Sequence, residues 1–134
     1  MPLPSHLSEQ SLGYALHTNR ELGLMLGGAK PLAVFSQIDG DFPGPVRRYL
    51  RMFDRHVRAG TLVRRDHREV LQSDGAHLHV VLFARPEEAW RIDAMIDLRR
   101  HLGAWTPEHE RAEGRLLGYE DWQNDLWISR CFGD

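Results

Sequence analysis

Apolar residues recur at helical spacing between residues 44 and 58, and this is the clearest pattern in the chain. Residues at the spacing i, i+3, i+4, i+7 and i+11 lie along the same side of a helix. These apolar positions are Val46, Tyr49, Leu50, Phe53 and Val57. Gly60 then stands where a left-handed residue commonly ends a helix. The pattern therefore predicts an amphipathic helix over residues 44–58.

Three other segments have the pattern of β-strands. Residues 61–71 and 77–84 predict a hairpin around Asp74-Gly75, a dipeptide that favours a type I′ turn. The first of these segments is nearly all charged, which is typical of an edge strand, and the second is mostly apolar, which is typical of a strand covered on both faces. With the apolar run that opens residues 32–38, the sequence predicts a three-stranded sheet in the order 61–71, 77–84, 32–38. Helix 44–58 would cross between the outer strands.

Helices are also predicted on either side of this unit. Thr18 and Glu21 match a capping box that would begin a short helix ending at Gly27. A long helix is expected from Pro86 to about Leu102, followed by helices over 107–117 and from about 120, with Trp122 and Leu126 facing the core. The whole chain, residues 1–134, is predicted to be a single α+β domain with a helical C-terminal half and a loosely ordered N-terminal arm at about residues 1–15.

Composition indicates the class of protein and the compartment in which it is expected. With 134 residues, 42% of them hydrophobic and 27% charged, the chain has the balance of an ordinary globular domain. Cys131 is the only cysteine, so no internal disulfide can form. The N-terminal residues lack the pattern of a secretory signal, and no apolar run reaches the roughly 20 residues that a membrane span needs. A cytoplasmic protein is therefore expected.

The formal net charge of −2 conceals a segregation along the sequence. Residues 1–46 carry −2, residues 47–85 carry +5 and residues 86–134 carry −5. The positive segment contains eight arginines on the predicted helix and the following edge strand: Arg47, Arg48, Arg51, Arg55, Arg58, Arg64, Arg65 and Arg68. These side chains are expected to form one cationic surface, and arginine binds carboxylates and phosphates through paired hydrogen bonds.

An acidic protein partner is the leading hypothesis for this surface, in a small non-enzymatic binding or regulatory protein. The edge strand could also pair with a strand of the partner. RNA or DNA binding by the same face is the alternative, but the aromatic residues of the segment fall on the core side of the helix, and the pI near 6.4 is not basic. Trp90 and Trp127 lie off the main apolar stripes of their helices, so a homodimer also stays open.

Histidine chemistry is a weaker hypothesis, and no cofactor is expected. His77 and His79 share a strand face, but the expected hairpin register sets Asp66 opposite Phe83, roughly 13 Å along the strand from His79. His109, Glu110 and Glu113 resemble a truncated HExxH motif and would serve a metal-dependent hydrolase. A surface pair one helical turn apart accounts for the same residues, so no metal site is predicted.

Overall fold

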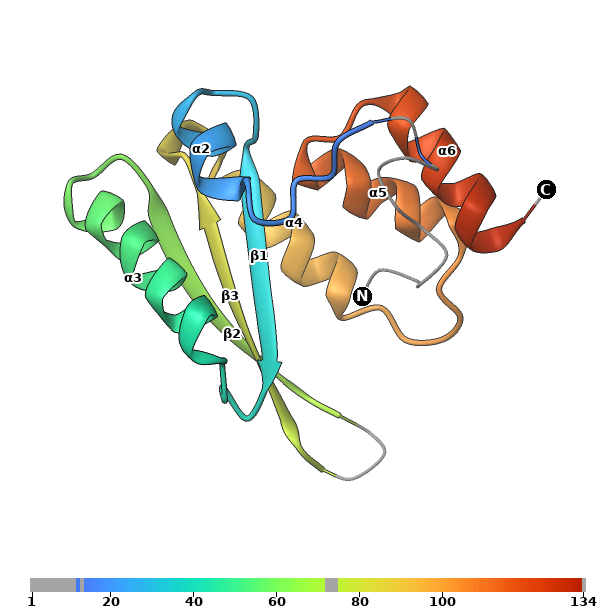
Figure 1. Cartoon of the computed structure of the whole chain (residues 1–134). Coiled ribbons are helices and arrows are strands. Elements are labelled where there is room, and N and C mark those ends of the chain that lie inside the picture. Colours follow the sequence, from blue (N-terminus) through green and yellow to red (C-terminus); the bar gives the residue numbers. More distant parts are fainter. Residues whose placement is uncertain (1–11, 13, 72–74, 134) are drawn as a thin grey trace.

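The computed structural model describes residue 12, residues 14–71 and residues 75–133. Most of the predicted N-terminal arm, and Asp74 of the predicted turn, lie outside these residues. The strands are β1 (Leu32–Ile38), β2 (Val63–Val70) and β3 (His77–Ala84). The helices are α2 (Glu21–Leu26), α3 (Gly44–Arg58), the 3-10 helix η1 (Pro86–Glu88), α4 (Trp90–Arg99), α5 (Pro107–Leu117) and α6 (Asp121–Phe132), as Figure 1 shows.

β3 lies in the middle of a three-stranded antiparallel sheet, with β1 and β2 at its two edges. Ala84 of β3 pairs with Leu32 of β1 on one side and with Val63 of β2 on the other. Because both edge strands are antiparallel to β3, they run parallel to each other, and α3 crosses between them. The predicted strand order, the α+β class and the helical C-terminal half are confirmed.

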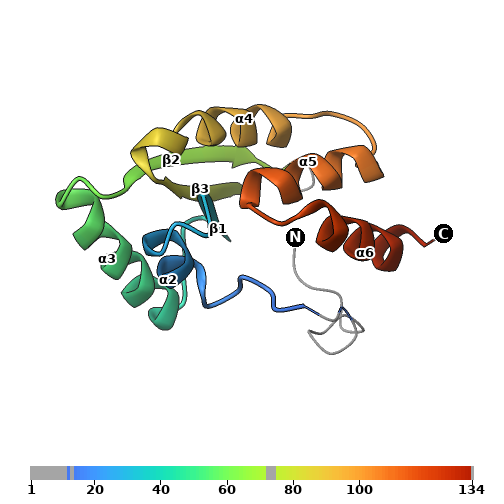
Figure 2. The ribbon, with the colours of Figure 1, turned by 90° about the horizontal axis from the view of Figure 1, so that it is seen from above.

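Helices cover both faces of this sheet, and Figure 2 shows α4 on one face with α2 and α3 on the other. The core under α2 and α3 includes Leu22, Met25, Leu50, Phe53, Val81 and Phe83. The core under α4 includes Leu32, Val80, Leu82, Ile92, Met95 and Ile96. Alternate residues of β3 therefore enter different cores, which explains its continuous apolar run.

Helix α3 has the predicted bounds and the predicted orientation. Leu50 and Phe53 of its apolar stripe are buried against the sheet. Tyr49 ties the helix to α2, because its hydroxyl donates to Glu21 Oε1 at 3.1 Å and accepts from the backbone N–H of Leu22 at 3.0 Å. Gly60 has a φ of +80°, as expected for the residue that redirects the chain into β2.

The predicted capping box at the start of α2 is wrong. Arg20, and not Thr18, precedes the first helical residue, and it makes no side-chain capping bond. A turn occupies the residues before it, with Asn19 at a φ of +66° and the Arg20 N–H bonded to the carbonyl of His17 at 2.8 Å. Instead, the Leu22 N–H, which has no acceptor within the first turn of the helix, donates a hydrogen bond to the Tyr49 hydroxyl.

Two predictions about the C-terminal helices are also wrong. The helix predicted from Pro86 is divided into η1 and α4, and α4 ends at Arg99 without reaching Leu102, whose side chain is 79% exposed. Trp122 is 49% exposed, and the buried residue of α6 is Asn124, which faces Gly114 of α5. Among the helices of the described residues, none has the length and apolar character that crossing a membrane requires.

β2 and β3 pair two positions away from the expected register. Asp66 faces Val81 instead of Phe83, and His79 faces Arg68. Leu71 and Ala76 are already joined by a backbone hydrogen bond of 2.7 Å, so the connection is longer than a two-residue turn at Asp74-Gly75. An even shift keeps every side chain on its expected face. It moves Asp66 to within hydrogen-bonding distance of His79.

Candidate functional site

The eight arginines of the predicted surface do not share one face. The five on α3 are exposed on the sides of the helix that point away from the sheet. On β2, Arg64 and Arg68 lie on the face that α3 covers, whereas Arg65 lies on the opposite face and pairs with Asp93 of α4. Strand alternation imposes this division, because neighbouring residues of a strand point to opposite faces. The expectation of one surface with eight arginines is therefore wrong.

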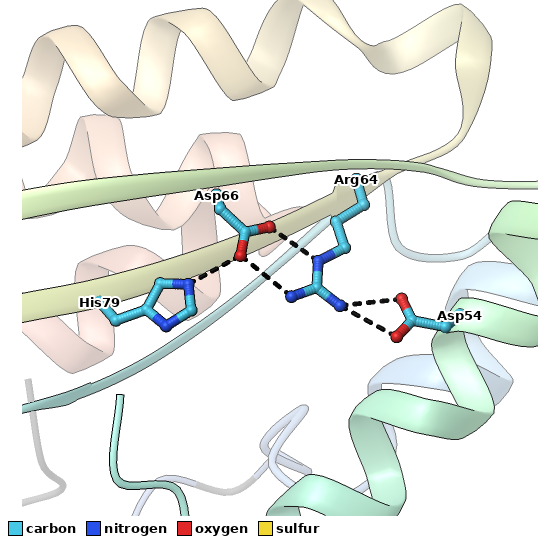
Figure 3. Close-up of polar contacts among 4 residues, drawn as sticks. All are labelled: Asp54, Arg64, Asp66 and His79. Carbon is cyan, nitrogen blue, oxygen red and sulfur yellow. Dashed lines mark hydrogen bonds and ion pairs between the residues drawn. The ribbon is translucent and has the colours of Figure 1, made fainter. Parts of the chain in front are cut away.

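Arg64 forms the centre of a polar network on the α3 side of the sheet, drawn in Figure 3. Its guanidinium donates to both carboxylate oxygens of Asp54 at 2.9 Å and to both of Asp66 at 2.7 and 3.0 Å. His79 Nε2 donates to the same Asp66 at 2.7 Å. The network joins α3, β2 and β3, so it fixes the helix over the edge of the sheet.

The network also stabilises the charged forms of Asp66 and Arg64. Hydrogen bonds from Arg64 lower the pKa of Asp66, and the bonds to Asp66 and Asp54 raise the pKa of Arg64. Arg64 is thus fully engaged by two carboxylates and offers no free donor pair to a partner. Its predicted role in docking loses its geometric basis.

Six arginines of the predicted set are exposed and lie outside the ion pairs of Arg64 and Arg65: Arg47, Arg48, Arg51, Arg55, Arg58 and Arg68. Within the described part of the chain, none of the six has an ion-pair partner. Arg47, Arg51 and Arg58 share a helical row with Asp54, which brings them beside β2. Arg48 and Arg55 form a second row with Met52, farther from the sheet. We call these six residues the arginine face.

The histidine motif on α5 is used for local structure. The His109 ring nitrogen Nδ1 accepts from the Thr106 backbone N–H at 3.0 Å, which completes a capping box at the start of the helix. Glu110 is buried, and its two carboxylate oxygens accept from the indole N–H groups of Trp105 and Trp127. No cluster of three or more His, Cys, Asp or Glu suited to a metal occurs among the described residues. His109 Nδ1 and both carboxylate oxygens of Glu110 are thus used in contacts within the chain.

The two tryptophans that suggested an interface lie in different surroundings. Trp127 packs against Leu12 and Leu16 and bonds to Glu110, so contacts within the chain account for it. Trp90 is exposed, and the guanidinium of Arg91 lies 4.7 Å from the centre of its ring.

A cavity of about 270 Å³ lies among β1, α4, α5, α6 and the chain segment before α2. The chain segment before α2 runs across to α6, as Figures 1 and 2 show, and its residues Tyr14, Leu16 and His17 line the cavity. Val34 of β1, Met95 of α4 and Leu117 of α5 supply apolar wall. Lys30 and His17 line the same cavity. We call this space the Lys30 cavity.

Lys30 is the functional candidate that the sequence prediction missed. Its side chain is only 2% exposed, and its Nζ donates to His17 Nδ1 at 2.8 Å and to the carbonyl oxygen of Leu117 at 2.7 Å. The His17 ring stacks on Tyr119 with centroids 3.8 Å apart. Lys30 is the only lysine in the chain, which was the available signal, but nothing in the local sequence says that it is buried.

Burial shifts the ionisation of this pair, which has no carboxylate in contact with Nζ among the residues that the structure describes. Desolvation lowers the pKa of Lys30 to about 7, and desolvation together with the Lys30 charge lowers the pKa of His17 to about 4. His17 is therefore a neutral imidazole at pH 7, and its Nδ1 accepts from Lys30. At the α5 side of the cavity, burial and the neighbouring Glu110 raise the pKa of Glu113.

The lowered pKa of Lys30 predicts stability that rises with pH. Between the folded value near 7 and the ordinary value of 10.5, the unfolded chain binds more protons than the folded one. The free energy of unfolding should therefore increase from pH 7 to pH 9, by at most about 1.4 kcal/mol per pH unit. Urea denaturation at several pH values measures the slope. Lys30→Met should flatten it, and an equal slope in both proteins would contradict the assignment.

Searches with protein-family models, among curated proteins and among solved structures find no match to this chain. Function is therefore inferred from the geometry of the described residues.

Proposed function

We propose that this chain is a small cytosolic, non-enzymatic binding or regulatory protein that docks an acidic protein partner through the arginine face. The observation that supports it is the set of exposed arginines along α3, which have no ion-pair partner among the described residues. A helix held to the sheet by Leu50, Phe53 and the Arg64 network presents them from a fixed backbone. Rigid presentation lowers the entropy cost of binding.

The surroundings of the arginines favour a protein over a nucleic acid. Tyr49 and Phe53 pack on the core side of α3, so the face has no aromatic ring on which bases could stack. Met52, 47% exposed, stands in the row of Arg48 and Arg55. Methionine and arginine are both enriched in protein interfaces.

The edge of β2 adds a second means of contact. β2 lies at one end of the strand order, and within the described residues its ladder partner is β3 alone. An extended segment of a partner could therefore add to the sheet through backbone hydrogen bonds. Arg68 on β2 stands on the same side as α3 and would contact acidic side chains of such a segment. Acidic residues at alternate positions of the partner strand would suit it.

Charge reversal on α3 tests the proposal. The triple variant Arg48→Glu, Arg51→Glu, Arg55→Glu should reduce partner capture on the order of 100-fold, because each lost contact is replaced by repulsion. Its melting temperature should change little, because all three side chains are exposed. Cross-linking capture from lysate of the source cells, quantified by mass spectrometry, measures the loss.

A matched variant distinguishes the effect of losing arginines on α3 from the effect of changing the net charge of the protein. Arg100→Glu, Arg115→Glu, Arg130→Glu changes the total charge by the same amount on α5, α6 and the end of α4, where all three residues are exposed. It should retain capture. Nuclease treatment of the lysate should not affect capture either, whereas loss on nuclease treatment would assign the face to nucleic acid. Equal capture by wild type and both variants would exclude docking through α3.

A further inference from the structure

Lys30 combines deep burial with an incomplete set of hydrogen bonds. An ammonium group has three donors, and two of them reach His17 Nδ1 and the Leu117 carbonyl oxygen. Within the described residues no third acceptor contacts Nζ, and the ring of Tyr119 lies 5.7 Å away. Both acceptors are neutral groups, so no carboxylate of the described ranges is in contact with the charge. The Lys30 side chain therefore has an unused donor and lines a cavity large enough for a small molecule.

The groups around Nζ favour a neutral amine near physiological pH. The titratable neighbours among the described residues are His17 and Tyr119, with Glu21 of α2 acting over a longer distance. Desolvation outweighs the effect of Glu21 and lowers the pKa of Lys30 to about 7. About half of the Lys30 side chains then carry a free lone pair at pH 7, compared with roughly one in 3,000 for an exposed lysine. A desolvated amine of this kind is a nucleophile towards carbonyl carbon.

A purely structural role makes the opposite prediction about reactivity. Lys30 donates to the Leu117 carbonyl at the C-terminal end of α5, where a cation is favourable. If that contact were its whole purpose, the amine would be protected from reagents in the folded protein. Reactivity in the folded state therefore distinguishes the two roles.

We propose that the Lys30 cavity binds a small neutral aldehyde or ketone, and that Lys30 holds it as a Schiff base. The apolar wall formed by Val34, Met95 and Leu117 suits an uncharged carbon skeleton. Glu110 and Glu113 line the same space, and the cation Arg99 beside them is already bonded to Glu69, so anionic carbonyl compounds such as keto acids are disfavoured. This site is separate from the arginine face and goes beyond the docking function.

The bonding change is an ordinary condensation. The unprotonated Nζ of Lys30 attacks the carbonyl carbon, forming a C–N bond while the carbonyl π electrons move to oxygen, and a proton then passes from the nitrogen to that oxygen. The nitrogen lone pair of the resulting carbinolamine then expels the protonated hydroxyl group as water. The product is a protonated imine, so one ammonium and one carbonyl compound give one iminium and one water. His17 Nδ1, 2.8 Å from Nζ, orients the amine by accepting a hydrogen bond, while the proton that the ammonium loses before attack passes to water and returns to the hydroxyl group that leaves.

Reductive trapping in a chain with one lysine tests this proposal. The folded protein is treated with benzaldehyde and cyanoborohydride at pH 7, and peptide mapping locates the benzyl group. The variant Arg100→Lys supplies an exposed lysine in the same chain as the internal reference, because the Arg100 side chain is 66% exposed. Lys30 should be labelled at least about 10-fold faster than that reference, with a pH midpoint near 7. Labelling of Lys30 no faster than the reference overturns the proposal.

A second comparison tests whether the cavity selects its ligand. Benzaldehyde and 4-carboxybenzaldehyde have the same ring and aldehyde, but the second carries a negative charge. The neutral compound should label Lys30 severalfold faster, whereas the introduced surface lysine should show a much smaller preference. Glu113→Gln should reduce the difference at Lys30, and Glu108→Gln, on the exposed side of the same helix, should leave it unchanged. Equal rates for both compounds at Lys30 in the wild-type protein would contradict binding inside the cavity.

Discussion

Replacing Phe53 by alanine is expected to lower the free energy of unfolding by about 3–5 kcal/mol, the usual cost of removing a fully buried aromatic ring. The Phe53 side chain has no exposed surface, and its ring stacks on Phe83 with centroids 4.5 Å apart. Phe35 and Tyr49 meet it edge-on at 5.4 and 5.0 Å. These rings come from α3, β1 and β3, so a cavity here loosens the helix that presents the arginine face.

Urea denaturation followed by circular dichroism measures this effect, and Met52→Ala is its matched control. Met52 is the neighbouring residue of the same helix, but its side chain is largely exposed, so its truncation should change stability by no more than about 0.5 kcal/mol. Similar losses from the two substitutions would show that Phe53 is not part of a close-packed core. Partner capture should fall with Phe53→Ala only to the extent that the protein unfolds.

Gly114→Ala should destabilise the protein by about 1–3 kcal/mol, although alanine favours helices. A Cβ atom on Gly114 would lie 2.7 Å from Cγ of Asn124, much closer than real side chains approach. Asn124 is buried where α6 crosses α5, and its Nδ2 donates to the Tyr119 carbonyl at 3.4 Å, so it has little room to move. The substitution would push apart the two helices that close the Lys30 cavity.

Gly23→Ala is the matched control for this prediction. Gly23 lies in α2, and a Cβ atom there meets nothing within 4 Å. Alanine at this position should stabilise the protein by about 0.5–1 kcal/mol through helix propensity alone. Opposite signs for the two substitutions in thermal or urea unfolding are the expected result. A gain in stability from both would mean that α5 and α6 are not in close contact at Gly114.

The elements with strong local patterns could be predicted from the sequence. The stripe on residues 44–58 repeats at helical period and ends at Gly60, so its pattern and its stop signal agree. The contrast between the charged strand 61–71 and the apolar strand 77–84 placed the second in the centre of the sheet, because only a central strand needs apolar residues on both faces. The same helical period that turns Leu50 and Phe53 toward the sheet turns the arginines of α3 toward water.

The predictions from sequence were wrong where a contact with a distant part of the chain competes with a local sequence signal. Thr18 has the right spacing to cap α2, but Tyr49, 27 residues after Leu22, bonds to the free amide of the first turn. The register of β2 on β3 depended on a connection longer than the predicted turn. That shift brought His79 to Asp66 and contributed to the Arg64 network, which removed one arginine from the docking surface.

Local periodicity thus determined the helices, the strand order and the exposed arginines of α3, because these follow from which side chains must leave water. Only the tertiary structure decided which charges neutralise one another and which polar groups are buried. Arg65 pairs across to α4 and Arg64 to α3, and Lys30 meets His17 and Leu117 from segments 13 and 87 residues away. The free energy of a charge depends on its surroundings in space, and spacing along the chain does not specify them.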